Sequence, residues 1–344
     1  MYEMKDVYVL IGRILSHNYD DALLSNEIHN FSSWDDLVKI SSEQLLLPSI
    51  FWSLKKKELL GILPKDLRSF LAEIHDINFN RNASISKQLN SIAELFKVNN
   101  INYVLLKGAA FITFLPDSDK GLRMIGDIDI LVQPDQLDHA VGLMKRDGYQ
   151  TGATFNYEVK NFRHAPRLIS PDNIAAVEIH TSIVNPGKSD VLSSKDIFDQ
   201  KEEFEGLQLP SKDHLIISTI LSSQVNSHGR YYYSLHLKYI YDSIFYELSN
   251  DNSLIEGMAK DRIFHFFLTS AAYIFKDFEH LKEYDFYYKQ VKWLEMRFRF
   301  PRIFNLLLKI KWIFFNMRER ITIFLNNSSY RRHVFKNKIF PFFN

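Results

Sequence analysis

The chain has 344 residues, of which 46% are hydrophobic and 24% are charged, and this composition is typical of a globular protein rather than a disordered one. The length is enough for two or three domains of ordinary size. The formal net charge of +1 gives no overall preference for nucleic acid or acidic partners, and the absence of cysteine excludes disulfides and thiolate metal sites.

The sequence contains no recognisable export signal or membrane span. Its first residues, MYEMKDVYVLIGRIL, include acidic side chains and lack the small-residue cleavage site of a signal peptide. The most apolar stretch, residues 303–315, is shorter than the roughly 20 residues of a membrane-spanning helix and contains Lys309 and Lys311. We therefore expect a cytoplasmic protein.

Residues 1–97 are predicted to be helical. The segment SSWDDLVKISSEQLLLPSIFWSLKKKELLG begins with serines that can cap a helix, followed by acidic residues in the first turn. Trp34, Leu37 and Val38 then recur at helical spacing. A second long helical pattern ends at the pair Asn99-Asn100, which favours a helix end.

The pattern changes at residue 101 and predicts a small α/β unit that extends to about residue 185. The order is strand, helix, strand, helix and then two strands paired around the turn SPDN. The segments are INYVLL (101–106), AAFITFL (109–115), DIDILV (127–132), DQLDHAVGLMKRDGY (135–149), NFRHAPRLIS (161–170) and NIAAVEIHTSI (173–183). From residue 209 onward the patterns are again helical.

Two aspartates one residue apart, Asp127 and Asp129, lie inside the predicted strand DIDILV. Side chains alternate across a strand, so both carboxylates point the same way while Ile128 and Ile130 point into the core. With a rise of about 3.3 Å per residue, the carboxylates lie roughly 6–7 Å apart and can share hard divalent cations such as Mg²⁺. Such pairs are also common as solvated edge residues and turn caps, so the pair alone leaves both interpretations open.

A third carboxylate is available on the predicted strand NIAAVEIH. The strand period places Ala176, Glu178 and His180 on one face. If this strand lies beside DIDILV, Glu178 can ligate one of the cations and act as general base for an attacking hydroxyl. The alternatives are that Glu178 is an exposed strand residue and that His180 is structural rather than a substrate contact.

Positive charges lie close to these carboxylates in the sequence. Gly108 follows the first predicted strand and lets the backbone approach a ligand, and the start of the next helix favours an anionic phosphate. Lys107 and Arg123 supply cations for the same phosphate, although either can be a solvated surface residue. The order of strand, Lys-Gly, helix, arginine, strand with two aspartates and strand with glutamate is a more specific sign of a phosphate site than any one of these features.

The motifs LKGAAF, GLRMIGDIDILV and VEIH together resemble a nucleotidyltransferase family of the DNA polymerase beta-like superfamily. Its members carry a pattern close to LKG-x-A, R-x-x-x-D-[IV]-D-[IL]-L-V and a later E-[IL]-H. The resemblance extends upstream through WDDLVKISSEQLLLPSIFWSL and downstream to HLKYIYDSI, which is similar to a family helix ending in a W/Y-x-x-D element. It covers roughly residues 30–250, and Asp242 falls on the last position of that element.

The resemblance implies an α+β fold in which a small mixed-sheet nucleotidyltransferase core is flanked by helical regions. Together with the sequence patterns described above, it predicts three domains, which are a helical N-terminal region at residues 1–97, the core at residues 98–208 and a helical C-terminal region at residues 209–344. We expect the core to hold the reaction chemistry.

The resemblance also implies the reaction. A nucleoside triphosphate would donate a nucleotidyl group to a hydroxyl acceptor with release of pyrophosphate, and the acceptor stays open among a sugar, another small molecule, a protein side chain and an RNA end. Asp127, Asp129 and Glu178 would be the catalytic carboxylates and the ligands of two Mg²⁺ ions. The residues expected to contact the triphosphate or substrate are Lys107, Gly108, Arg123 and His180.

The chain departs from the superfamily pattern in two places. Lys107 and Ala109 stand where many members have a glycine-serine pair, so the charges of Lys107 and Arg123 would replace a hydroxyl contact to phosphate. Glu178 stands where aspartate is commoner. These departures keep an alternative open, namely a catalytically inactive nucleotide-binding or interaction protein recruited through its basic aromatic tail. A toxin–antitoxin role is a third alternative, disfavoured by the length of the chain.

The C-terminal segment, residues 289–344, is basic and aromatic, with 13 Lys or Arg against 2 Asp or Glu. Its leading interpretation is an amphipathic helix packed on the core, followed by peripheral contact with the inner face of an anionic membrane and then by a nucleic-acid patch. Upstream, His228, Arg230 and His236 lie in or before a predicted helix. Their spacing matches no established metal motif, so we expect them to be structural.

Overall fold

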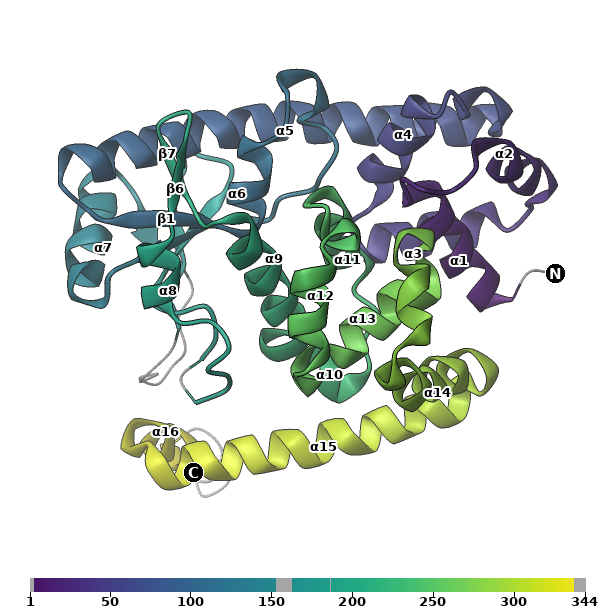
Figure 1. The fold of residues 1–344 in the computed structure, drawn as a ribbon. Coiled ribbons are helices and arrows are strands. Elements are labelled where there is room, and N and C mark those ends of the chain that lie inside the picture. The colour runs from purple at the N-terminus through teal and green to yellow at the C-terminus, as the bar shows by residue number, and fades with distance from the viewer. Residues whose placement is uncertain (1–2, 153–162, 186, 337–344) are drawn as a thin grey trace.

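The computed structural model describes residues 3–152, 163–185 and 187–336. It is an α+β fold, as predicted, in which a small mixed sheet lies toward one end of the molecule and the N-terminal helices lie toward the other (Figure 1). The buried apolar side chains form one continuous core that includes the N-terminal helices, the sheet and the C-terminal helices.

The first part of the described chain is helical, as expected. Asp20 caps the second helix by accepting a hydrogen bond from the backbone N–H of Leu23. The fifth helix has 34 residues and runs from the N-terminal helices across to the sheet (Figure 1). These helices are α1 (Met4–Leu15), α2 (Asp21–Asn30), α3 (Trp34–Glu43), α4 (Leu47–Lys56) and α5 (Lys65–Val98).

The main sheet has five strands in the order β1-β2-β5-β4-β3. The strands are β1 (Tyr103–Leu106), β2 (Asp127–Val132), β3 (Gln150–Thr151), β4 (Leu168–Ile169) and β5 (Ala176–His180). Strands β2 and β5 are parallel and the other pairs are antiparallel, so the sheet is mixed, as the resemblance implied. Two helices accompany it, α6 (Lys107–Thr113) directly after β1 and α7 (Leu137–Arg146) in the crossover from β2 to β5.

The predicted pairing around SPDN is confirmed in a shorter form. Strand β4 pairs with β5, and an isolated bridge joins His164 to His180, but the rest of the expected strand is irregular. The first two residues of that prediction, 161 and 162, lie outside the described residues.

One hairpin was not expected from the sequence. Strands β6 (Glu202–Phe204) and β7 (Leu207–Leu209) form it around Glu205 and Gly206, which both have positive φ. The sequence pattern was too short and too charged to indicate strands. Helix α8 (Ser194–Asp199) precedes the hairpin, and β7 packs beside β1.

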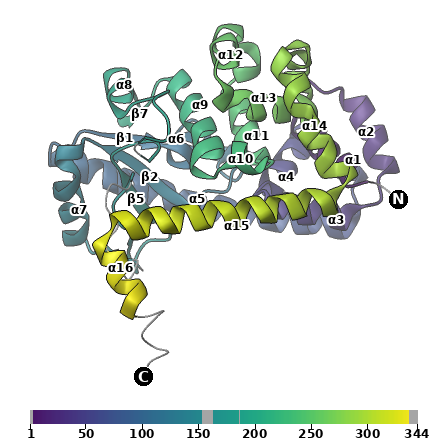
Figure 2. The ribbon, with the colours of Figure 1, turned by 90° about the horizontal axis from the view of Figure 1, so that it is seen from below.

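The third part of the chain is helical, with α9–α13 packed beside α6 and the N-terminal helices and α15 running along one side of the molecule (Figure 2). The α-helices are α9 (Lys212–Leu221), α10 (Gly229–Tyr232), α11 (Leu237–Phe245), α12 (Asn252–Ala259), α13 (Arg262–Ile274), α14 (Asp285–Arg299), α15 (Pro301–Asn326) and α16 (Ser328–Val334). Short 3₁₀-helices lie at Leu60–Ile62, Asp117–Asp119, Pro134–Gln136, Leu248–Asn250 and Lys276–Glu283, and a π-helix at Ser222–Asn226.

Helix α5 ends at Val98 and β7 ends at Leu209, close to the expected limits of the core, although the division into domains stays a prediction. Among the residues described, every helix is too short or too polar to cross a lipid bilayer.

Candidate functional site

The site is built on the parallel pair β2 and β5. Their register places Asp129 directly opposite Glu178, which confirms the predicted neighbourhood of these two carboxylates. Ile128 and Ile130 are buried on the other face of β2, as the strand alternation required. The apolar face of the strand therefore anchors the sheet in the core and fixes the direction of the acidic face.

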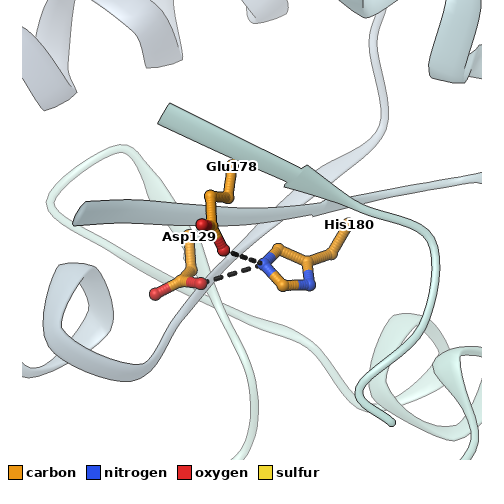
Figure 3. A group of neighbouring side chains, drawn as sticks. All are labelled: Asp129, Glu178 and His180. Carbon is orange, nitrogen blue, oxygen red and sulfur yellow. Dashed lines mark hydrogen bonds and ion pairs between the residues drawn. The ribbon is translucent and has the colours of Figure 1, made fainter. Parts of the chain in front are cut away.

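Asp129, Glu178 and His180 form a compact group whose ligand atoms all lie within 4.8 Å of one another. His180 Nε2 is 2.9 Å from Asp129 Oδ1 and 3.5 Å from Glu178 Oε2 (Figure 3). This group contains the kinds of atom that ligate a cation. Asp127 is not part of it, although it belongs to the same strand face.

Cationic side chains of the chain itself neutralise the carboxylates. Lys107 Nζ donates a hydrogen bond of 2.5 Å to Asp129 Oδ1, and Arg167 forms an ion pair with Asp127. Glu178 Oε2 also lies 3.7 Å from His164 Nε2. Each acidic group therefore has a positively charged or protonatable neighbour.

These neighbours set the pKa values of the acids. Burial acts to raise the pKa of Asp129, but the Lys107 ammonium and His180 outweigh it and hold the pKa well below its usual range. The hydrogen bond from His180 lowers the pKa of Glu178. Burial raises the pKa of Asp127, although the charge of Arg167 opposes it. Asp129 and Glu178 are therefore ionised at neutral pH.

Lys107 has an unusual backbone conformation. Its φ of 50° is in the left-handed region, where a side chain costs about 1–2 kcal/mol relative to glycine. The conformation occurs at the junction of β1 and α6 and accompanies the contact between the ammonium group and Asp129. The strained residue is therefore also the one whose ammonium group contacts the acidic site.

Gly108 is required by close packing. A Cβ atom at this position would lie 2.5 Å from Arg123 Nη1 and 3.2 Å from Ile125 Cγ2, so no side chain fits without movement. The sequence interpretation attributed this glycine to phosphate approach. The structure adds a second reason, which is the position of Arg123 directly behind it.

Arg123 has a partner that the sequence interpretation did not foresee. Its Nε and Nη2 donate hydrogen bonds of 2.7 Å each to the two carboxylate oxygens of Asp242, and both side chains are buried. This bidentate pair ties the loop before β2 to α11. We therefore assign Arg123 and Asp242 a positioning role.

A row of polar side chains on α5 holds the same loop and was missed in the sequence. The side-chain amide of Asn82 donates hydrogen bonds of 2.7 Å to the carbonyls of Lys120 and Arg123, and Asn78 donates one of 2.8 Å to Gly121. Arg81, which lies between these two residues, donates to the carbonyls of Ile125 and Gly126, and Gln88, farther along the helix, donates to the carbonyl of Ala175. The sequence carried a signal for three of them, because Asn78, Asn82 and Gln88 lie among the apolar residues on the buried face of α5.

Lys238 on α11 is a second residue that the sequence did not single out. Burial lowers its pKa to about 8, with further lowering by Arg123 and Lys107, while Asp242 and Asp129 act in the opposite direction. It therefore adds another cation to the surroundings of the carboxylates.

The histidines downstream are structural, as expected. His236 Nδ1 lies 2.9 Å from Ser223 Oγ of the π-helix, and the ring of His228 packs against Phe315. Burial lowers the pKa of His236 to about 4. His236 is therefore neutral at pH 7.

Residues 31–250 match the model of a family described as an uncharacterised nucleotidyltransferase, and this chain belongs to that family. No curated protein matches the sequence. The match includes the whole site described above, from α5 through Asp242. Family membership and the Asp129–Glu178–His180 group together support nucleotidyl transfer. Membership of the wider DNA polymerase beta-like superfamily stays a prediction.

Proposed function

We propose that this protein is a Mg²⁺-dependent nucleotidyltransferase that moves a nucleotidyl group from a nucleoside triphosphate to a hydroxyl acceptor and releases pyrophosphate. The observation that carries the proposal is the in-register pairing of β2 and β5, which brings Asp129 and Glu178 together on the strand face that also bears Asp127. A structural core gains nothing from three neighbouring carboxylates, because their mutual repulsion and desolvation are unfavourable.

The donor atoms fit a divalent cation. Mg²⁺ prefers oxygen ligands, and Asp127, Asp129 and Glu178 would hold two such ions, with Asp129 between the other two carboxylates. When bound, the ions polarise the phosphoryl oxygens and reduce the charge repulsion against an incoming oxygen. Because imidazole is a less suitable ligand for Mg²⁺, we assign His180 to orienting the two carboxylates through its Nε2.

The remaining side chains would act on the triphosphate and on the acceptor. Lys107 is partly exposed beside Asp129 and would contact the phosphates, and Lys238 would add positive charge. Glu178 is ionised and would accept the proton of the attacking hydroxyl, although its lowered pKa makes it a better metal ligand than base. Burial lowers the pKa of the neighbouring His164, which is therefore neutral at pH 7 and able to accept a proton.

A second candidate function rests on the same ion pairs. Asp127 is paired with Arg167 and Asp129 with Lys107, so the site is compensated without an added cation. A protein that binds nucleotides or partners without catalysis would need this compensation permanently. In a transferase, bound metal ions and phosphates would replace some of these ion pairs.

Calorimetric titration of ATP, GTP, CTP and UTP, with and without Mg²⁺, separates these functions. The comparison uses wild type, Asp129→Asn and the matched control Asp117→Asn, which alters an exposed carboxylate paired with nearby Lys120. We expect Mg²⁺-dependent binding of at least one triphosphate, at least tenfold weaker in Asp129→Asn and unchanged in Asp117→Asn. Circular dichroism of each variant establishes that it is folded.

The competing outcomes are distinct. Triphosphate binding that needs no Mg²⁺ and survives Asp129→Asn would favour the non-catalytic alternative. Folded wild-type protein that binds none of the four triphosphates would contradict the donor assignment. Once the nucleotide donor is known, turnover is measured as pyrophosphate release in the presence of candidate hydroxyl acceptors. Asp127→Asn should abolish this release.

A further inference from the structure

Helix α15 carries a stripe of exposed apolar side chains. Nine of them are between 42% and 67% exposed and recur every three or four residues, as on one face of a helix. The stripe extends for about 33 Å at 1.5 Å per residue. Its members are Ile303, Leu306, Leu307, Ile310, Ile313, Phe314, Met317, Ile321 and Leu325.

The opposite face of α15 attaches the helix to the rest of the protein. Phe304 is buried, and the ring of Phe315 packs against His228 and Tyr231 of the segment around α10. Lys311 Nζ donates a hydrogen bond of 3.1 Å to the carbonyl of Tyr231 and lies 4.3 Å from the ring centre of Tyr233. The helix is therefore held along the side of the molecule (Figure 2), and the exposure of its apolar stripe shows that the stripe faces outward.

This geometry corrects the leading interpretation of the C-terminal segment. Packing against the core holds for α14, where Leu294 is buried and Trp293 stacks on Tyr233, but not for the apolar stripe of α15. An apolar surface of this length is unusual on a protein in water and indicates a binding surface.

The charges beside the stripe are positive. Arg302, Lys309 and Arg320 are exposed, and their spacings of seven and eleven residues place them along one edge of the helix. Arg318, on the other edge, is also exposed. The single acidic residue of α15, Glu319, is paired with Lys188 at 3.6 Å.

These charges distinguish among the partners that could cover the stripe. A second copy would bring the same basic edges together, and its α15 would offer no unpaired carboxylate to balance them. A nucleic acid would neutralise the cations but would leave the apolar side chains in water. An anionic lipid surface satisfies both features, because apolar side chains enter the acyl boundary while Lys and Arg meet the headgroups.

We propose that α15 is a membrane-docking helix that lies flat on an anionic lipid bilayer, with the stripe inserted and its basic edges against the headgroups. The proposal is independent of the catalytic function proposed above. Because Lys188 follows β5 and pairs with Glu319, docking would hold the sheet end of the molecule beside the lipid surface.

Co-sedimentation with vesicles tests the proposal in the full-length protein. The vesicles contain either neutral phosphatidylcholine alone or phosphatidylcholine with 30% phosphatidylglycerol, at low and high salt. Wild type is compared with Leu306→Gln/Ile310→Gln/Phe314→Gln. The matched control is Leu23→Gln/Ile77→Gln/Val98→Gln, which removes three exposed apolar side chains on other helices.

We expect wild type and control to bind anionic vesicles at least tenfold more tightly than neutral ones, with weaker binding at high salt. The α15 variant should lose at least tenfold of that binding while keeping its circular dichroism spectrum. Arg302→Gln/Lys309→Gln/Arg320→Gln should also bind more weakly, because it removes the headgroup contacts.

Three results would overturn the proposal. One is equal binding of wild type to anionic and neutral vesicles, or binding to neither. Another is that wild type binds no vesicles and forms a stable dimer in sedimentation velocity, whereas the α15 variant is a monomer. That result would identify a second copy of the chain as the occupant of the stripe. The third is vesicle binding unaffected by loss of the apolar side chains, together with charge-dependent binding of a single-stranded oligonucleotide, which would identify a nucleic-acid surface.

Discussion

Replacing Asp242 with asparagine should destabilise this protein strongly. Two hydrogen bonds of 2.7 Å join its carboxylate to Arg123, and the side chains are only 2% and 5% exposed. Asparagine keeps the shape but removes the charge, so the guanidinium is left buried without a counter-ion. Breaking one partner of a buried ion pair costs about 3–5 kcal/mol, and we expect a loss in this range.

The assay is equilibrium unfolding in urea of wild type, Asp242→Asn, and the three members of a double-mutant cycle, which are Asp242→Leu, Arg123→Met and Arg123→Met/Asp242→Leu. Replacing both partners with apolar side chains removes both charges, so the double variant should lose less than the sum of the single changes. The double-mutant cycle should give a coupling free energy of about 3 kcal/mol. Because Arg123 also supports the turn at Gly108, the single variants should bind triphosphate more weakly.

The control is Asp199→Asn, which breaks an exposed pair with Lys195 and should leave stability almost unchanged. The reasoning is refuted if Asp242→Asn stays within about 1 kcal/mol of wild type, or if the changes at Arg123 and Asp242 are additive. Either result would mean that water or another group compensates the guanidinium.

Three further predictions concern neighbouring parts of the fold. In urea unfolding, Lys107→Gly should be more stable than Lys107→Ala by about 1 kcal/mol. Both variants lose the ammonium group, but only glycine adopts a φ of 50° without strain, so equal stabilities would contradict the prediction. Asn82→Ala should lose about 2–4 kcal/mol by leaving one buried and one part-buried carbonyl unpaired, whereas Asn80→Ala, at an exposed position, should change stability little. Similar losses in the two variants would contradict the role assigned to α5. Burial lowers the pKa of His236 to about 4, whereas in the unfolded chain the pKa is about 6.5. The free energy of unfolding of wild type should therefore decrease as the pH is lowered from about 6.5 to 4, because the unfolded chain gains a proton that the folded protein does not. His236→Gln should flatten this part of the stability curve, and an unchanged slope would argue against the lowered pKa.

Sequence patterns were sufficient where the determining interactions are local or periodic. The alternation in DIDILV gave the direction of Asp129 and the burial of Ile128, and the same rule placed Glu178 and His180 on one face of β5. The pairing of the two strands needed one further assumption, that they are neighbours, and the structure confirms it. The helical N-terminal region followed in the same way from the spacing of its apolar residues.

Tertiary structure decided the partners of the charged groups. Arg123 is near Asp127 in sequence, yet its guanidinium pairs with Asp242, 119 residues away. Arg167 reaches Asp127 because β4 lies beside β5 in the sheet. Periodicity does not contain this information, because the partner of a long charged side chain depends on which surfaces fold together.

By itself, the sequence determined the α+β class, the acidic strand face, the family motifs and the basic aromatic character of the C-terminal segment. Only the tertiary structure decided that Lys107 rather than Arg123 reaches Asp129, and that α5 holds the loop before β2. It also decided that the apolar side chains of α15 face outward. The physical reason is that amphipathicity predicts an apolar face but not what covers it, since burial is a property of the assembled surfaces.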